Sequence, residues 1–201
     1  MKFFMASLIS VLLAAQCAPA RSLQSRRTGD QSVITAEEYA IYAAAINNEY
    51  ASISEDKTLV IVDWTSSDVS DPFDWGRDKE RLKKEFSSIS QEIIDDYEKI
   101  NAKSYQLKDS LNLKLKYALT PREKIREIFK RDPGGSEFHK QFPNSPGTTH
   151  VSRVGFNSTG DQALVYVSHI CGPLCASWSF VLLVKKDKEW VVQNQFVARV
   201  S

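Results

Sequence analysis

The stretch SRVGFNSTGDQALVYVSHICGPLCASWSFVLLVKKDKEWVVQNQFVARV, residues 152–200, contains four extended apolar segments with short polar breaks between them. Segments of this kind at short intervals are typical of consecutive antiparallel strands. Residues 163–169 are apolar on both faces, so we expect a central strand that is covered on both sides. The stretch therefore predicts a meander that closes a domain at its carboxyl-terminal end.

Polar turns separate these segments. We interpret NSTGD, residues 157–161, as a hairpin turn rather than a glycosylation acceptor, and residues 185–188 as a charged turn. Alternation then assigns one apolar face to each of the last two strands: Trp178, Phe180, Leu182 and Val184 in the first, and Trp190, Val192, Phe196 and Val200 in the second. Asn194 falls on the same face as Trp190 and Phe196 in this interpretation.

Helical spacing dominates the earlier part of the chain. Thr35 and Glu38 form a capping box ahead of apolar residues spaced three and four apart. Residues 79–100 carry one apolar stripe, which predicts a long helix that the serines at 87–90 can break. Thr120 followed by Pro121 predicts a further helix start.

Two further strands are expected upstream of the meander. TLVIVDW, residues 58–64, is rich in β-branched residues, and LNLKLKYAL, residues 111–119, alternates between apolar and polar residues. Together these patterns predict a single α+β domain over residues 35–201. We expect about six mostly antiparallel strands packed against three or four helices.

The amino-terminal residues have the composition of a secretory signal. A charged start and an apolar run end in Ala18-Pro19-Ala20, which predicts a signal peptide over residues 1–20 and cleavage after Ala20. Residues 21–34 are then expected to be a disordered lead-in. No later stretch approaches the roughly 20 apolar residues of a membrane helix, so we expect a secreted or periplasmic protein without a transmembrane segment.

Charge and motifs exclude several classes of function. The chain holds 26 basic and 25 acidic residues, a net charge of +1, which does not favour nucleic acid as a partner. The known signatures of zinc proteases, serine hydrolases and nucleotide-binding loops are missing from the sequence. We expect no cofactor.

The cysteines are the most specific chemical feature. Cys171 and Cys175 remain after signal removal, and an even number in an oxidising compartment favours a disulfide. Two alternatives stay open: a redox pair, and a metal site made by both cysteines with His169. The metal site needs a fourth ligand, for which His139 and His150 are available.

A ligand or metal site near His169 is the remaining candidate. His169, Tyr166 and Asn194 are polar residues on predicted strands with apolar faces, where a polar side chain can point into a pocket. We expect a non-enzymatic module that binds a small ligand or a protein. The alternative is a hydrolytic or metal-dependent enzyme with its site near His169.

The chain also resembles a family of uncharacterised secreted bacterial proteins. The similarity covers residues 35–201 and lies in EEYAIYAAAI, PREKIREIF and, above all, ALVYVSHICGPLC at residues 163–175. The meander looks somewhat like the curved sheet of nuclear transport factor two-like domains. That resemblance implies a pocket for a small molecule, but no activity.

Overall fold

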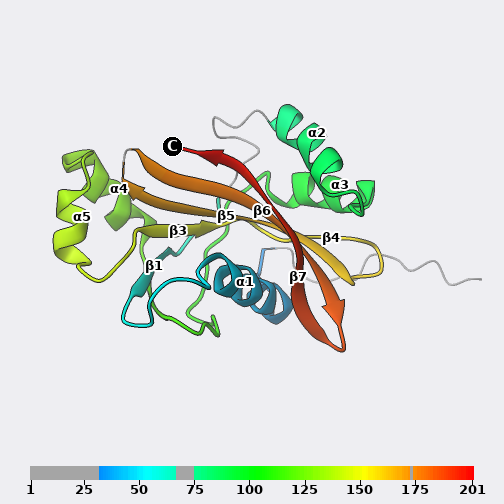
Figure 1. Cartoon of the computed structure of the whole chain (residues 1–201), viewed down its shortest axis with the longest axis horizontal. Helices are drawn as coiled ribbons and strands as arrows, with labels where there is room; N and C mark the ends of the chain where they lie inside the picture. The colour runs from blue at the N-terminus through cyan, green and yellow to red at the C-terminus, as the bar shows by residue number, and fades with distance from the viewer. Residues whose placement is uncertain (1–31, 67–74, 173) are drawn as a thin grey trace, which may run out of the picture.

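A mixed sheet of seven strands forms the centre of the molecule, and helices cover both of its faces (Figure 1). The strands are β1 (Thr58–Val62), β2 (Lys116–Thr120), β3 (Thr148–Val151), β4 (Gly155–Phe156), β5 (Gln162–Gly172), β6 (Cys175–Lys186) and β7 (Glu189–Val200). The helices are α1 (Ala36–Glu49), α2 (Trp75–Glu85), α3 (Gln91–Ile100), α4 (Arg122–Arg131) and α5 (Ser136–Gln141). The predicted single α+β domain is confirmed.

The computed structural model describes residues 32–66, 75–172 and 174–201. The predicted signal peptide, residues 1–20, lies outside this part of the chain, as do residues 21–31 of the predicted lead-in. Ile34, the last residue of that lead-in, is buried in the hydrophobic core. In the described part of the chain, no helix combines the length and apolar character that a membrane crossing requires.

The carboxyl-terminal meander is present as predicted. Strands β5, β6 and β7 pair antiparallel in sequence order, with Tyr166 opposite Phe180 and Phe180 opposite Phe196. Strand β5 is buried on both faces, because Val165 and Val167 pack on one side of the sheet and Leu164 and Tyr166 on the other. The apolar residues on both faces of this segment therefore identified the central strand correctly.

The upstream strands add parallel pairing that the sequence did not indicate. Strand β1 lies between β2 and β3 and is parallel to both. The prediction of a strand over residues 111–119 was wrong for its first half, since β2 begins only at Lys116. The backbone N–H of Leu111 instead donates to the Tyr117 hydroxyl, while the leucine side chain is buried.

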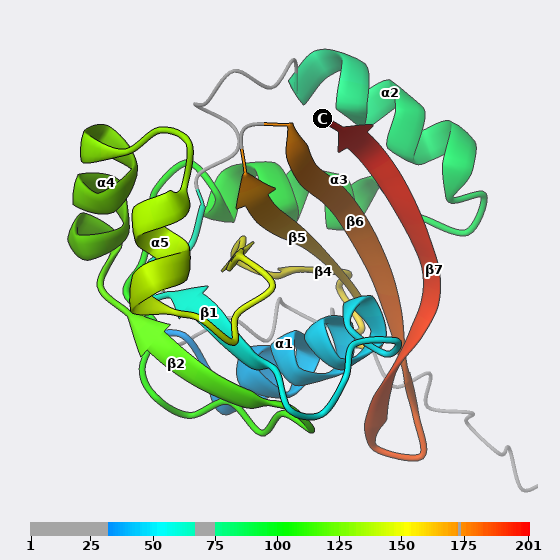
Figure 2. The ribbon, with the colours of Figure 1, turned by 60° about the vertical axis from the view of Figure 1, so that its left-hand side comes forward.

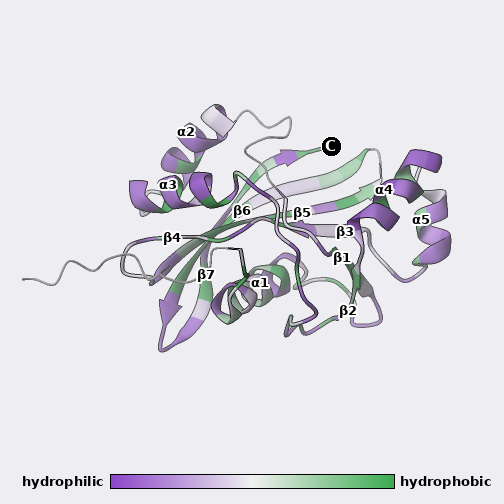
Figure 3. Cartoon of the chain, turned by 180° about the vertical axis from the view of Figure 1, so that it is seen from behind, coloured by the Kyte–Doolittle hydropathy of each residue, from purple (hydrophilic) through white to green (hydrophobic). Residues whose placement is uncertain are grey.

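Helix α1 covers one face of the sheet, and the other helices cover the opposite face in two pairs (Figure 2). Helices α2 and α3 pack on β5 and β6, whereas α4 and α5 pack on β1. Figure 3 shows apolar residues concentrated along the strands and hydrophilic residues on the outer sides of the helices. The face under α1 and the face under α2–α5 are thus distinct hydrophobic layers.

Side-chain caps mark the starts of α1 and α3. The predicted capping box of α1 is confirmed: Thr35 Oγ1 accepts from Glu38 N at 3.2 Å, and Thr35 N donates to Glu38 Oε2 at 3.0 Å. The predicted long helix over residues 79–100 is two helices, because Ser90 caps α3 by accepting from Ile93 N. Helix α4 starts after Pro121, as the sequence predicts, but without a side-chain cap.

A bulge in β7 changes which side chains share a face. Asn194 pairs with Leu182 and Val192 pairs with Leu183, so one residue of β7 has no opposite partner between them. Trp190 therefore packs in the α1 layer and Phe196 in the α2–α3 layer. The prediction that these side chains share one face was wrong, since strict alternation fails across a bulge.

Candidate functional site

The site lies where β5 ends and β6 begins, at the end of the sheet that also holds the carboxyl terminus (Figure 2). Cys171 and Cys175 form the predicted disulfide, with 5.1 Å between their Cα atoms. Both sulfur atoms are therefore bonded to each other and are not thiolate ligands for a metal. The disulfide closes the hairpin, and Gly172 pairs with Cys175 across it.

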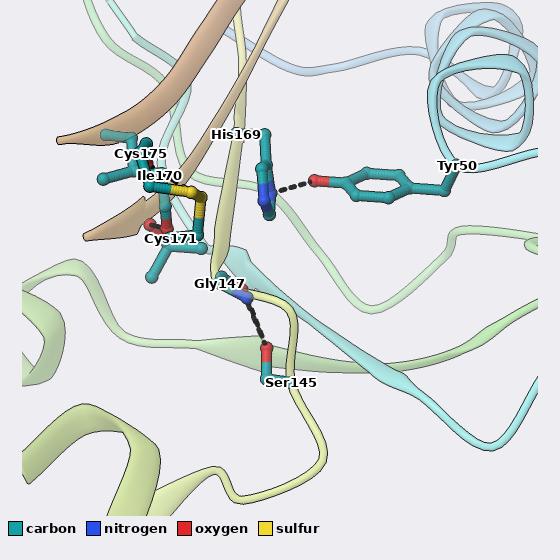
Figure 4. The surroundings of a disulfide bond; sticks show 8 residues. Tyr50, Ser145, Gly147, His169, Ile170, Cys171 and Cys175 are labelled. Atoms are coloured by element: carbon teal, nitrogen blue, oxygen red, sulfur yellow. Dashed lines mark hydrogen bonds between the residues drawn. A yellow bond between two sulfur atoms is a disulfide. The ribbon is translucent and has the colours of Figure 1, made fainter. Parts of the chain in front are cut away.

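Three polar side chains, of Tyr50, Thr149 and His169, are hydrogen-bonded to one another near this disulfide, and Figure 4 shows the Tyr50–His169 pair. The Tyr50 hydroxyl, at the carboxyl end of α1, is 2.8 Å from Nδ1 of His169 and 2.6 Å from Oγ1 of Thr149. The Tyr50 and His169 rings meet edge to face, 5.5 Å apart. Because Thr149 and His169 are opposite each other in β3 and β5, the three groups tie the end of α1 to the sheet.

Burial keeps the imidazole of His169 and the phenol of Tyr50 uncharged. It lowers the pKa of His169 below its ordinary value and raises the pKa of Tyr50 above its own. The imidazole is therefore neutral and the phenol protonated at pH 7. A neutral phenol, imidazole and hydroxyl can share hydrogen bonds and fix one another's orientation.

The loop before β3 packs against the end of the β5–β6 hairpin. Ser145 Oγ accepts from Gly147 N at 3.2 Å and donates to Gly147 O at 2.8 Å, which fixes the loop (Figure 4). A Cβ on Gly147 would lie 2.9 Å from His169 Cε1 and 2.9 Å from Cys171 Cα. The backbone of this glycine thus lies directly against the end of the hairpin.

The predicted site residues do not form one cluster. Tyr166 is buried on the opposite face of β5 from His169 and packs against Phe180, with 5.0 Å between ring centroids. Asn194 lies at the edge of the sheet, where its Nδ2 donates to the Glu85 carbonyl at 3.4 Å. Only His169 of the three candidates lies near the disulfide.

The three histidines are likewise separated. His150 directly follows Thr149 in β3, so it points to the face opposite His169. His139 is on α5, where its ring contacts Phe138. Among the described residues, no group of three or more His, Cys, Asp or Glu side chains could hold a metal ion.

Exposed apolar side chains lie at this end of the sheet, and sequence patterns did not predict their exposure. Leu174, between the cysteines, is 89% exposed, and Val200 is 75% exposed. Val200 and Val197 pair with Ser177 and Ser179, which places both valines on the His169 side of the sheet. Leu174, Val197 and Val200 are called the apolar end below.

His150 predicts a pH dependence of stability. Burial lowers its pKa from 6.5 to about 4, so the unfolded chain binds this proton at higher pH than the folded chain does. The free energy of unfolding should therefore fall as the pH drops from about 6.5 to 4, by up to roughly 3 kcal/mol for this group. The lowered pKa of His169 acts in the same direction.

Urea unfolding at pH 7, 5.5 and 4.5 measures this effect. His150→Gln cannot be protonated in this range, so most of the slope should disappear in that variant. His139→Gln, on the exposed side of α5, is the matched control and should retain the wild-type slope. An unchanged slope in His150→Gln would contradict the assignment.

Comparison of the chain with protein-family models, curated proteins and solved structures finds no match. The resemblances to secreted bacterial proteins and to nuclear transport factor two-like domains therefore stay predictions. This end of the sheet combines a disulfide, three hydrogen-bonded polar side chains near it and exposed apolar residues.

Proposed function

We propose that the protein is a secreted or periplasmic, non-enzymatic binding module that presents its apolar end to a protein partner. One observation carries the proposal: Leu174 is 89% exposed in a loop that the Cys171–Cys175 disulfide closes. Moving such an exposed apolar side chain from water into an apolar socket of a partner is favourable in free energy. Burying a leucine contributes about 1.5–3 kcal/mol.

The support beneath Leu174 is rigid, which favours binding. The disulfide closes the loop, and β7 anchors the start of β6 because Ala176 and Ser201 exchange two backbone hydrogen bonds of 3.0 and 3.1 Å. The Gly147 backbone packs against the end of β5. A preorganised loop loses little conformational freedom when it binds, so more of the contact energy appears as affinity.

The chemistry of the apolar end defines the partner. Leu174, Val197 and Val200 are uncharged, and the neighbouring His169 is kept neutral by burial. We therefore expect a partner with an apolar socket, and an affinity that depends only weakly on salt. A disulfide at an exposed position is also consistent with an oxidising compartment, in agreement with the predicted signal peptide.

Crosslinking at position 174 tests the proposal. The chain is exported by its host with p-benzoylphenylalanine in place of Leu174 and, as a control, in place of Val191, which is exposed at the other end of β7. After irradiation we expect one discrete protein adduct from position 174 and none from position 191. The adduct partner is then identified by mass spectrometry and purified.

Direct binding to that purified partner completes the test. Leu174→Asp should weaken binding at least tenfold, whereas Val191→Asp should change it less than twofold. Equal adducts from both positions, or a Leu174→Asp variant that binds like the wild type, would show that the apolar end is not the docking surface.

A further inference from the structure

The Cys171–Cys175 disulfide is accessible from solution. Cys175 is exposed and Cys171 is half-buried. A Cβ built on Gly172, inside the same loop, would meet no atom of the described chain within 4 Å, its two chain neighbours aside. A thiolate can therefore approach the bridge without any unfolding of the sheet, and exposed disulfides are more easily reduced than buried structural ones.

The bridge contributes little to holding the sheet together. Its two cysteines are four residues apart in the sequence, and closing so short a loop removes little conformational freedom from the unfolded chain. The β5–β6 ladder continues without the bridge, since Ile170 pairs with Ala176 next to the loop. Ala176 also exchanges two backbone hydrogen bonds with Ser201, of 3.0 and 3.1 Å. Reduction of the bridge should therefore leave the sheet intact.

The same bridge closes the loop that carries Leu174. The register of β5 and β6 shifts between Ile170 and Gly172, so Cys171 lies at a bulge. Beyond this bulge, the described part of the hairpin has a single pair, Gly172 with Cys175, which the disulfide encloses. A single pair beyond an interrupted ladder is weak without covalent closure. Opening the bridge should thus loosen the loop around Leu174 and nothing further.

We propose that the Cys171–Cys175 disulfide is a redox switch that controls binding at the apolar end. This inference rests on the proposed function, because Leu174 is the residue through which the apolar end docks. The oxidised loop holds Leu174 in one place before the partner arrives. In the reduced loop the same residues must be ordered on binding, and this ordering lowers the affinity.

The reductant is a dithiol, and the exchange balances without another reactant. One of its thiolates attacks Sγ of Cys175, the more exposed cysteine, so that a mixed disulfide forms and the Cys171–Cys175 bond breaks. The second thiol of the reductant then attacks the reductant's own sulfur in the mixed disulfide and releases Cys175. Two electrons pass from the dithiol to the bridge, and the two protons of the dithiol end on Cys171 and Cys175.

Reduction of the exported protein by millimolar dithiothreitol tests whether the bridge is reached in the folded state. The freed thiols are alkylated and counted by intact mass, in buffer and in denaturing urea. A route through global unfolding would slow reduction of the folded protein by about a thousandfold or more. We expect the two rates to agree within about a hundredfold, and a larger difference would overturn the switch.

Hydrogen exchange then separates the loop from the sheet. In the reduced protein we expect faster exchange at the amides of Gly172 and Cys175, and unchanged exchange at residues 163–168 of β5. Unchanged exchange at Gly172 and Cys175 would show that the bridge does not hold the loop. Faster exchange throughout residues 163–168 would show that the bridge supports the whole sheet, and either result overturns the switch.

Crosslinking distinguishes the switch from the proposed function. With p-benzoylphenylalanine at position 174, the double substitution Cys171→Ser and Cys175→Ser should lower the yield of the adduct at least about fivefold. Equal yields with and without the bridge would overturn the switch and leave the apolar end in place. No adduct in either background would overturn the apolar end itself. The reduction and exchange measurements use the unsubstituted chain, so they decide the inference even if the double variant is not exported.

Discussion

Glu38→Gln is expected to lower the free energy of unfolding by about 3–5 kcal/mol, the usual cost of breaking a buried ion pair. Glu38 and Arg153 have side chains that are each 2% exposed, and their atoms meet at 2.8 Å and 3.1 Å. Glutamine can still complete the capping box of α1. The loss therefore reports the missing charge opposite the guanidinium rather than a lost helix start.

Denaturant unfolding followed by circular dichroism measures this loss, and the adjacent residue provides the control. Glu37 pairs with Lys185 on the surface, with side chains 36% and 29% exposed. Because exposed pairs contribute only about 0–1 kcal/mol, Glu37→Gln should have a small effect. If the two variants lose the same stability, the buried pair is not a major support of the fold.

The large effect is expected because Arg153 connects three parts of the molecule. Its side chain bonds Glu38 of α1, while its backbone N–H donates to Asn101 Oδ1 at 2.7 Å, just after α3. The Asn101 amide returns a bond of 3.1 Å to the Arg153 carbonyl. One segment between β3 and β4 thus joins the helices on both faces of the sheet.

Sequence patterns predicted the elements of this fold better than their pairing. An apolar run identified β5, alternation identified β6, and the Thr35–Glu38 box identified the start of α1, because all three signals are local. The parallel position of β1 between β2 and β3 depends on residues far away in the sequence, since Thr58 pairs with Lys116 and Val60 pairs with Thr148. No local period encodes such a choice of partner.

The candidate site was likewise predicted only where the signal is local. The cysteine spacing and predicted compartment indicated the Cys171–Cys175 disulfide, whereas the partner of His169 is Tyr50, 119 residues earlier in the chain. Asn194 was misplaced because a bulge in β7 interrupts the alternation on which the prediction relied. Leu174 lies in a loop, so no strand or helix period marked it, and its exposure is seen only in the structure.

Gly147→Ala is expected to lower the free energy of unfolding by about 3 kcal/mol, because backbone strain and overpacking each cost about 1–3 kcal/mol. The glycine has a φ of +147°, which L residues with a side chain rarely adopt. Its new Cβ would also press on the Ile170 carbonyl oxygen and would lie 2.9 Å from Cys171 Cα. These neighbours are backbone atoms, so a change of rotamer cannot relieve the contact.

Gly172→Ala is the matched control, since a Cβ at Gly172 would meet nothing within 4 Å. It should leave stability nearly unchanged although it lies inside the same disulfide loop. Hydrogen exchange distinguishes local from global effects: Gly147→Ala should also speed exchange at residues 169–171, whose strand the new Cβ displaces. If both variants keep wild-type stability and exchange, the loop before β3 does not support the hairpin, and the rigidity attributed to the apolar end would rest on the disulfide and β7 alone.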